Sequence, residues 1–303
     1  MSTSLLHRLL IAPLPYVPQS MIWQLSQRYI AGTDLASAYQ SVTALNELGC
    51  KTTIDVLGED STTVQEVETA RDLYLAALAG INKRELDCNA SIKLSDMGLR
   101  FDVDLCSEVM QTIVATADRY GNFIRIDMED SSVTSTTLDI YRQLRERFDN
   151  VGTVIQSCLH RSADDIRSLL DAGIAHLRLC KGIYVEPQEI AYTDADDIRN
   201  SYMELLQRLF EGGATKVGIA THDPLLVEFA EELIGRLNVD KSRYEFQMLL
   251  GVAGTMRSRL ISAGHPLRVY VPFGDRWHAY SMRRLRENPG IAMHIVRNLF
   301  TRR

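Results

Sequence analysis

Short runs of β-branched and aliphatic residues alternate with longer amphipathic segments from residue 51 onward. Between the runs, apolar residues recur at the three- and four-residue spacing of a helix, for example over residues 64–80 and 162–173. Pro224 suits the start of one such helix and Gly173 the end of another. The pattern predicts eight strands, each followed by a helix, with the strands at residues 52–57, 90–94, 123–128, 152–156, 175–180, 216–220, 244–249 and 267–271.

Eight strand–helix units favour an α/β fold in which a parallel sheet closes into a (β/α)₈ barrel. The main alternative is an open doubly wound sheet, which usually has fewer strands and carries a GxGxxG turn that is missing here. Residues 1–50 add about two helices that we expect to pack on a barrel formed by residues 51–303. No linker or low-complexity run divides the chain, so we expect one domain with an N-terminal helical extension.

Composition narrows the class of protein. The 303 residues are 46% hydrophobic, which is enough for a substantial core, and the net charge of −6 argues against nucleic acid as the main partner. Five scattered cysteines without metal-ligand spacing indicate reduced thiols. Arg8, Pro13 and Pro15 interrupt the apolar N-terminus, so it predicts neither a signal peptide nor a spanning helix. We expect a cytoplasmic protein.

Polar residues gather where the predicted strands end. In a (β/α)₈ barrel the chemistry lies at the C-terminal ends of the strands, which meet at one opening. Any one such residue is more often an exposed rim residue than a site residue, but their convergence on one opening favours a site. The residues are Glu59, Lys93, Asp127, Met128, Gln156, Arg178, Lys181, Thr221, His222, Gln247 and Tyr270.

The segment RIDMEDSS admits two interpretations. Asp127 and Glu129 alternate to the same side of a strand, and with Asp130 they could ligate magnesium or manganese through oxygen. The favoured interpretation is a loop and helix cap, because acids are also stabilising near the start of a helix.

Two further strand exits have open chemistry. The cations Arg178 and Lys181 suit a phosphate or an electron-rich ring, and Gly182 lets the backbone approach a bulky ligand closely. Lys181 also suits a Schiff base. Thr221 and His222 begin a helix, where free N–H groups bind anions, and His222 is equally a general base or a cap.

Arg283 and Arg284 are adjacent on a predicted helix after the last strand. Tyr280 precedes them and Glu287 follows them at three- and four-residue spacing, so these side chains can meet. Either Glu287 pairs with an arginine on an exposed face, or the arginines bind a small carboxylate in a pocket completed by Tyr280 and Glu287. The residues alone leave both readings open.

Nine motifs occur in one order along the chain: DVLGED, IKLSDMGL, RIDMEDSS, VIQSCLHR, LRLCKGIYVEP, ATHDP, YEFQMLLGV, RVYVPFG and YSMRRLREN. From about residue 28 to the C-terminus the chain resembles the proline dehydrogenase family in its monofunctional bacterial form. The resemblance implies a distorted (β/α)₈ barrel with non-covalent FAD. It also implies oxidation of L-proline to Δ¹-pyrroline-5-carboxylate, with electrons passed to a membrane quinone.

The resemblance implies roles for individual residues. Asp127 and Arg178 become catalytic residues, and Glu59 becomes a gate that pairs with the first arginine. Tyr270 favours proline over 4-hydroxyproline. The predicted substrate residues are Lys93, Tyr184, Leu249, Tyr270, Tyr280, Arg283, Arg284 and Glu287. The predicted cofactor residues are Met128, Gln156, Arg178, Lys181, Gly182, Ile183, Thr221, His222 and Gln247. If the resemblance holds, the acids of RIDMEDSS bind no metal, and Lys181 contacts the flavin and forms no Schiff base. Cys180 and Ile183 depart from the valine and alanine common in the flavin turn, which we expect to tune the flavin environment.

The resemblance also implies partners. We expect a separate pyrroline-5-carboxylate dehydrogenase to process the product, and no nucleic acid. Residues 290–303 alternate apolar and basic positions, which favours packing on the barrel over weak contact with the inner face of the cell membrane. Two rival classes remain: a lyase or aldolase with Lys93 or Lys181 as its Schiff base, and a non-enzymatic amino-acid-binding scaffold.

Overall fold

Eight parallel strands form a closed barrel in chain order, with β8 paired to β1. The structure, a computed structural model, describes residues 19–58, 60–278 and 280–282. Each predicted run is a strand, so the predicted barrel is confirmed and the open doubly wound sheet is excluded. The strands are β1 (Lys51–Val56), β2 (Cys88–Lys93), β3 (Ile124–Asp127), β4 (Val151–Gln156), β5 (His176–Cys180), β6 (Lys216–Ala220), β7 (Tyr244–Leu249) and β8 (Leu267–Phe273).

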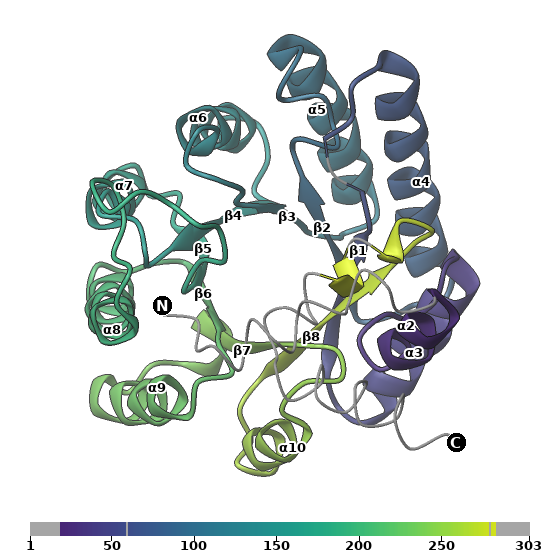
Figure 1. Cartoon of the computed structure of the whole chain (residues 1–303). Helices are drawn as coiled ribbons and strands as arrows, with labels where there is room; N and C mark the ends of the chain where they lie inside the picture. Colours follow the sequence, from purple (N-terminus) through teal and green to yellow (C-terminus); the bar gives the residue numbers. More distant parts are fainter. Residues whose placement is uncertain (1–18, 59, 279, 283–303) are drawn as a thin grey trace.

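Helices surround the barrel, and those between consecutive strands form an outer ring (Figure 1). They are α4 (Val64–Lys83), α5 (Val103–Arg119), α6 (Thr134–Arg145), α7 (Ser162–Asp171), α8 (Ala195–Glu211), α9 (Pro224–Leu237) and α10 (Gly254–Ser262), with a short 3₁₀ turn η2 (Lys241–Arg243) before β7. Helices α2 (Gln19–Ser26) and α3 (Leu35–Glu47) precede the barrel. Within the described residues, no helix combines the length and apolarity needed to cross a membrane.

Local sequence signals set the helix ends. Thr63 and Glu66 form a reciprocal capping box at the start of α4. Asp223 caps α9, whose first residue is Pro224, and Asn238 ends it in the left-handed conformation. The polar loops after the strands therefore turn into helices at defined residues.

Helix α3 packs against the barrel beside α4. Ala38, Val42 and Leu45 of α3 are buried in the main hydrophobic core. The Tyr39 hydroxyl donates to backbone carbonyls of α4, and a side chain at Gly80 would overlap it. The division at residue 50 into N-terminal helices and barrel stays a prediction.

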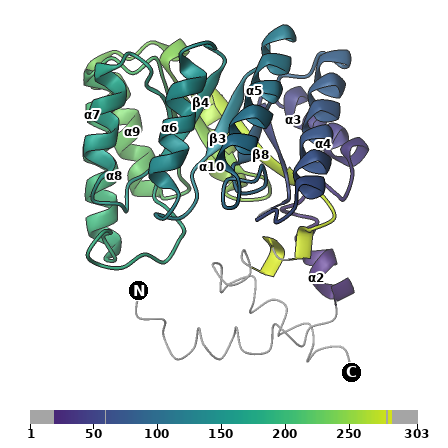
Figure 2. The same cartoon turned by 90° about the horizontal axis from the view of Figure 1, so that it is seen from above.

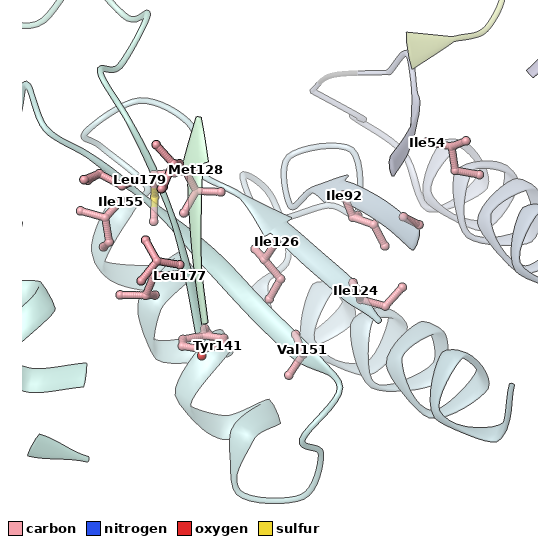
Figure 3. Close-up of a cluster of buried hydrophobic side chains, with 14 of the residues drawn as sticks. Ile54, Ile92, Ile124, Ile126, Met128, Tyr141, Val151, Ile155, Leu177 and Leu179 are labelled. Carbon is pink, nitrogen blue, oxygen red and sulfur yellow. The ribbon is translucent and has the colours of Figure 1, made fainter. Parts of the chain in front are cut away.

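Alternation along the strands separates two environments. Ile124 and Ile126 of β3 point outward into the core under the helices, with Ile54, Ile92 and Leu177 from neighbouring strands (Figure 3). The intervening residues point into the barrel and are largely polar or charged. The outer face therefore supplies the hydrophobic free energy, and the inner face is free to carry chemistry.

A buried ion pair lies inside the barrel near the N-terminal ends of the strands. Arg268 Nε lies 2.6 Å from Glu245 Oε1, and the Arg268 guanidinium also donates to the Thr52 carbonyl. Burial alone would raise the pKa of Glu245. The charges of Arg268 and Lys216 outweigh it and lower that pKa to about 2. Glu245 is therefore ionised and anchors the interior.

We expect Glu245→Gln to lower the free energy of unfolding by about 3–5 kcal/mol at pH 7, because it leaves Arg268 buried without its counter-charge. The folded-state pKa of Glu245 lies below its ordinary value of 4.5, so the pair's contribution is complete above 4.5 and lost as the pH falls toward about 2. Urea unfolding at several pH values should show the difference from wild type shrinking below pH 4.5. A difference that stays constant at all pH values would contradict this assignment.

Candidate functional site

A cavity of about 320 Å³ opens at the C-terminal ends of the strands. Every predicted site residue that the structure describes lines it, although their individual roles stay predictions. These are Lys93, Asp127, Met128, Gln156, Arg178, Lys181, Gly182, Ile183, Tyr184, Thr221, His222, Gln247, Leu249, Tyr270 and Tyr280. The lining also includes Asp55, Val154, Cys180, Ala220 and Met248, which were not among the predicted site residues.

Arg178 of β5 is buried and lines the inner end of the cavity, called its floor below. Its guanidinium donates to Asp127 Oδ1 at 2.6 Å and to Gln247 Oε1 at 2.6 Å. The Tyr270 hydroxyl donates to the other Asp127 oxygen at 2.7 Å, and the Tyr270 ring centre lies 5.4 Å from Arg178 Cζ. Side chains from β3, β7 and β8 thus hold the Arg178 cation of β5 in a single orientation.

Glu245, two residues earlier on β7, sets the orientation of the Gln247 side chain. Its amide nitrogen donates to Glu245 Oε1 at 2.7 Å, so its oxygen faces Arg178. Gly218 of β6 makes room, since a Cβ there would lie 2.6 Å from the Gln247 nitrogen. The buried Glu245–Arg268 pair is therefore connected through Gln247 to the floor of the cavity.

A second ion pair joins β1 to β2. Lys93 Nζ lies 2.9 Å from Asp55 Oδ1, and Asp55 is only 1% exposed. Burial raises the pKa of Asp55 to about 6, with the Lys93 charge opposing the rise and the Asp127 charge adding to it. The signal for Asp55 was an acid between Ile54 and Val56 in a strand that otherwise reads as buried.

Tyr270 stands between the two carboxylates. Burial, followed by the negative charges of Asp127 and Asp55, raises its pKa well above the ordinary value. Its hydroxyl therefore keeps its proton and acts as a donor to Asp127.

The exit of β5 forms the turn that was predicted to hold a flavin. Gly182 has φ of +98°, and a side chain there would overlap Cys158 Sγ. Lys181 Nζ pairs with Asp223 Oδ2 at 2.9 Å, and Arg199 reaches the same oxygen at 2.7 Å. Because Asp223 also caps α9, the β5 and β6 loops are tied together at the cavity edge.

Two more predicted cofactor residues have defined partners. The Gln156 amide donates to the Glu129 carbonyl at 2.9 Å. His222 Nε2 accepts from the Leu249 backbone N–H at 3.0 Å, so this nitrogen carries no proton while the bond exists. These contacts fix the positions of the β4 end and the β6 loop.

The three acids of RIDMEDSS, Asp127, Glu129 and Asp130, have different partners and do not form one cluster. Asp127 faces the cavity, Glu129 accepts from Ser95, and Asp130 accepts from Arg100 and Ser132. The expected cap is wrong, because α6 begins after Val133 without a side-chain hydrogen bond. Among the described residues no cluster of His, Cys, Asp or Glu could hold a metal ion.

Four predicted site residues, Glu59, Arg283, Arg284 and Glu287, lie outside the described residues, as does segment 290–303. Tyr280 is described and is buried against Ile30 and Leu57. Just before it, Trp277 contacts Trp23 of α2 with ring centres 4.7 Å apart, so α2 lies beside this short helical stretch (Figure 2).

The closed parallel barrel, with a hydrogen-bonded cavity at the C-terminal ends of its strands, is the architecture of (β/α)₈ barrel enzymes. Comparison with known families shows to which enzyme family the chain belongs. A family model described as proline dehydrogenase matches residues 38–296. Proline dehydrogenase 1 of Bacillus subtilis is 35% identical and proline dehydrogenase of Deinococcus radiodurans also 35%. The matches cover 90% and 96%, respectively, of both chains in each pair. The chain belongs to the proline dehydrogenase family and is an oxidoreductase.

Solved structures share the fold. Proline utilization A (PutA) from Bdellovibrio bacteriovorus, inactivated by N-propargylglycine, superposes with a TM-score of 0.82 at 22% identity, over 88% of this chain and 33% of that one. A PutA mutant from Bradyrhizobium japonicum gives 0.74 at 21% identity, over 88% and 31%. The chain thus spans about a third of these PutA chains, and the likeness shows a common barrel.

We expect Gly182→Ala to lower the free energy of unfolding, because the left-handed φ costs about 1–3 kcal/mol for alanine and the new methyl group overlaps Cys158. Adding Cys158→Ala removes the overlap and leaves the backbone strain, so the double variant should recover part of the loss. Urea unfolding of wild type, both single variants and the double variant measures this coupling. Strictly additive effects would show that Cys158 does not crowd the turn.

Proposed function

We propose that this chain catalyses the first step of proline catabolism. It oxidises L-proline to Δ¹-pyrroline-5-carboxylate with a non-covalently bound FAD, and the electrons pass to a membrane quinone. The names of its curated relatives support proline as substrate. The observation that carries the proposal is the immobilised Arg178 at the cavity floor, held by Asp127 and Gln247 beside the Lys181–Ile183 turn.

The cavity suits a flavin. An isoalloxazine ring presents carbonyl oxygens and ring nitrogens along one edge and apolar surface elsewhere. Arg178, Lys181 and Gln156 supply donors at the cavity, and Met128 and Ile183 supply apolar surface. The missing side chain at Gly182 lets a planar ring approach the backbone. We assign these residues, with Thr221, His222 and Gln247, to flavin binding.

The substrate half of the cavity suits a small cyclic amino acid. Lys93 contributes a cation, and Tyr184, Leu249, Tyr270 and Tyr280 contribute ring and aliphatic surface. Arg283 and Arg284 would bind the carboxylate, with Glu287 and the Glu59 gate completing the pocket; these four rest on the family resemblance.

When bound, a flavin would supply the redox chemistry, as the acceptor of the hydride from the ring carbon next to the proline nitrogen. The side chains of this chain bind and orient. The carboxylate contacts fix the ring, and the aromatic residues exclude water from its faces. Arg178 would stabilise the negative charge that a bound flavin would gain on reduction, and Asp127 and Gln247 keep that cation from moving.

The product then passes to a separate pyrroline-5-carboxylate dehydrogenase. Contact of the C-terminal segment with the membrane surface would bring the flavin near its quinone. Co-sedimentation with liposomes, with and without residues 290–303, tests that contact.

An anaerobic visible spectrum of the purified protein tests the proposed reaction. We expect a flavin spectrum that bleaches on addition of L-proline and much less with 4-hydroxyproline. A flavin that stays oxidised would contradict proline as substrate. Absence of flavin after reconstitution would overturn the proposal. A product trapped by borohydride on Lys93 or Lys181 would then support the lyase alternative.

Asp127→Asn keeps the size of the side chain and removes the charge that holds Arg178. We expect the flavin to stay bound and its anaerobic bleaching by proline to slow about 100-fold, the cost typical of a misplaced catalytic group. Stopped-flow absorbance measures the rate. Asp72→Asn serves as control, since Asp72 lies on the exposed side of α4 and, within the part of the chain that the structure describes, forms an ion pair with Arg71 alone. Wild-type bleaching in the Asp127 variant would refute this role.

A further inference from the structure

The Asp55 carboxylate is satisfied on one side only. Its Oδ1 pairs with Lys93 at 2.9 Å, whereas its Oδ2 is buried and has no hydrogen-bond partner among the described residues. The Tyr270 hydroxyl is close enough to Asp55 to lower its pKa as a hydrogen-bonding neighbour, but the single Tyr270 proton is donated to Asp127 at 2.7 Å. A buried carboxylate oxygen without a donor is costly, so this atom calls for an explanation.

Charged and titratable groups face Asp55 from four elements. They are Lys93 on β2, Asp127 on β3, Tyr270 on β8 and Tyr74 on α4. Among the described residues of this group, Lys93 is the one cation. Tyr74 is buried and donates its proton to the Ser91 carbonyl, so it does not serve Asp55. Two carboxylates thus lie close together in a site of low dielectric constant, with Arg178 held by Asp127 and Lys93 by Asp55.

We propose that Asp55 takes up one proton from solvent when a carboxylate ligand binds in the cavity and pairs with Lys93. This inference rests on the proposed function, which puts Lys93 in the substrate half of the cavity, and it adds Lys93 to Arg283 and Arg284 as a contact of the substrate carboxylate. The ligand brings a third negative charge into the group and competes for the Lys93 ammonium. A proton on Asp55 Oδ2 relieves both effects. The new O–H can donate to the Tyr270 oxygen, whose own proton remains on the Asp127 side.

The free site is already close to this protonation. Burial raises the pKa of Asp55 to about 6, so only a small further rise is needed for uptake near neutral pH. A pKa that is higher in the complex than in the free protein makes binding strongest at low pH. Above about pH 6 the affinity should therefore fall, approaching tenfold per pH unit until the pKa of the complex is reached.

The test uses the flavin-loaded full chain and cyclopentanecarboxylate, a five-membered ring acid without the nitrogen needed for oxidation. Titration calorimetry at pH 7.5 in two buffers of different ionisation enthalpy counts the protons taken up per ligand bound. Dissociation constants between pH 6 and 8 give the linkage independently. We expect fractional proton uptake at pH 7.5, larger the further the pKa of Asp55 rises in the complex, and affinity that weakens with rising pH.

Asp55→Asn should abolish the uptake, flatten the pH dependence and bind the acid more tightly than wild type at pH 8. Glu129→Gln is the matched control, since Glu129 is also a buried acid whose pKa is raised by burial, but it lies outside the cavity lining and bonds to Ser95. The control should keep the wild-type pH dependence.

Binding by wild type without proton uptake would overturn the inference and leave the proposed function intact, and this measurement decides even if Asp55→Asn does not fold. Uptake that persists in Asp55→Asn, or that disappears in Glu129→Gln, would also overturn it. Absence of binding at every pH, with flavin present, would overturn the substrate site and this inference together.

Discussion

A charged side chain inside a closed barrel loses its water, so it must be paired or fully hydrogen-bonded. Three ion pairs meet this requirement: Glu245 with Arg268, Arg178 with Asp127, and Lys93 with Asp55. Each pair joins two different strands. The strand register that closes the barrel therefore also assembles the site, and neither can change without the other. Gln247 connects the Glu245–Arg268 pair to Arg178 through two hydrogen bonds, so the buried pair also positions the cavity floor.

Because strand residues alternate between the two faces of the sheet, the outer face stabilises the fold and the inner face forms the site. Outward aliphatic residues pack under the helices and stabilise the fold, as Figure 3 shows for β1 to β5. Inward residues are free of that task and carry charges and hydrogen bonds. An oxidoreductase that must orient a small amino acid gains from this arrangement, because cations held by several strands move little and lose little entropy when the ligand binds.

The sequence predicted the strands well, because each is a compact β-branched run bounded by polar loops. It also predicted most of the cavity lining, since residues at strand ends must converge in a barrel. Asp55 was not predicted as a site residue, because its partner Lys93 is 38 residues away and only the β1–β2 register brings the two together. The cap of α6 was mispredicted because Glu129 and Asp130 find partners in other loops. Arg283 and Arg284, on which the carboxylate clamp depends, lie outside the described residues.

Cofactor and substrate should meet on the floor formed by the hydrogen-bonded Arg178. A crystal structure of the full chain with oxidised flavin and cyclopentanecarboxylate would test this placement. We expect the isoalloxazine ring at the strand ends against Arg178 and the Lys181–Ile183 turn, the ligand carboxylate on Lys93 beside Arg283 and Arg284, and the Arg178–Asp127 pair intact. Flavin bound elsewhere on the barrel, or Arg178 turned away from both Asp127 and the ring, would contradict it.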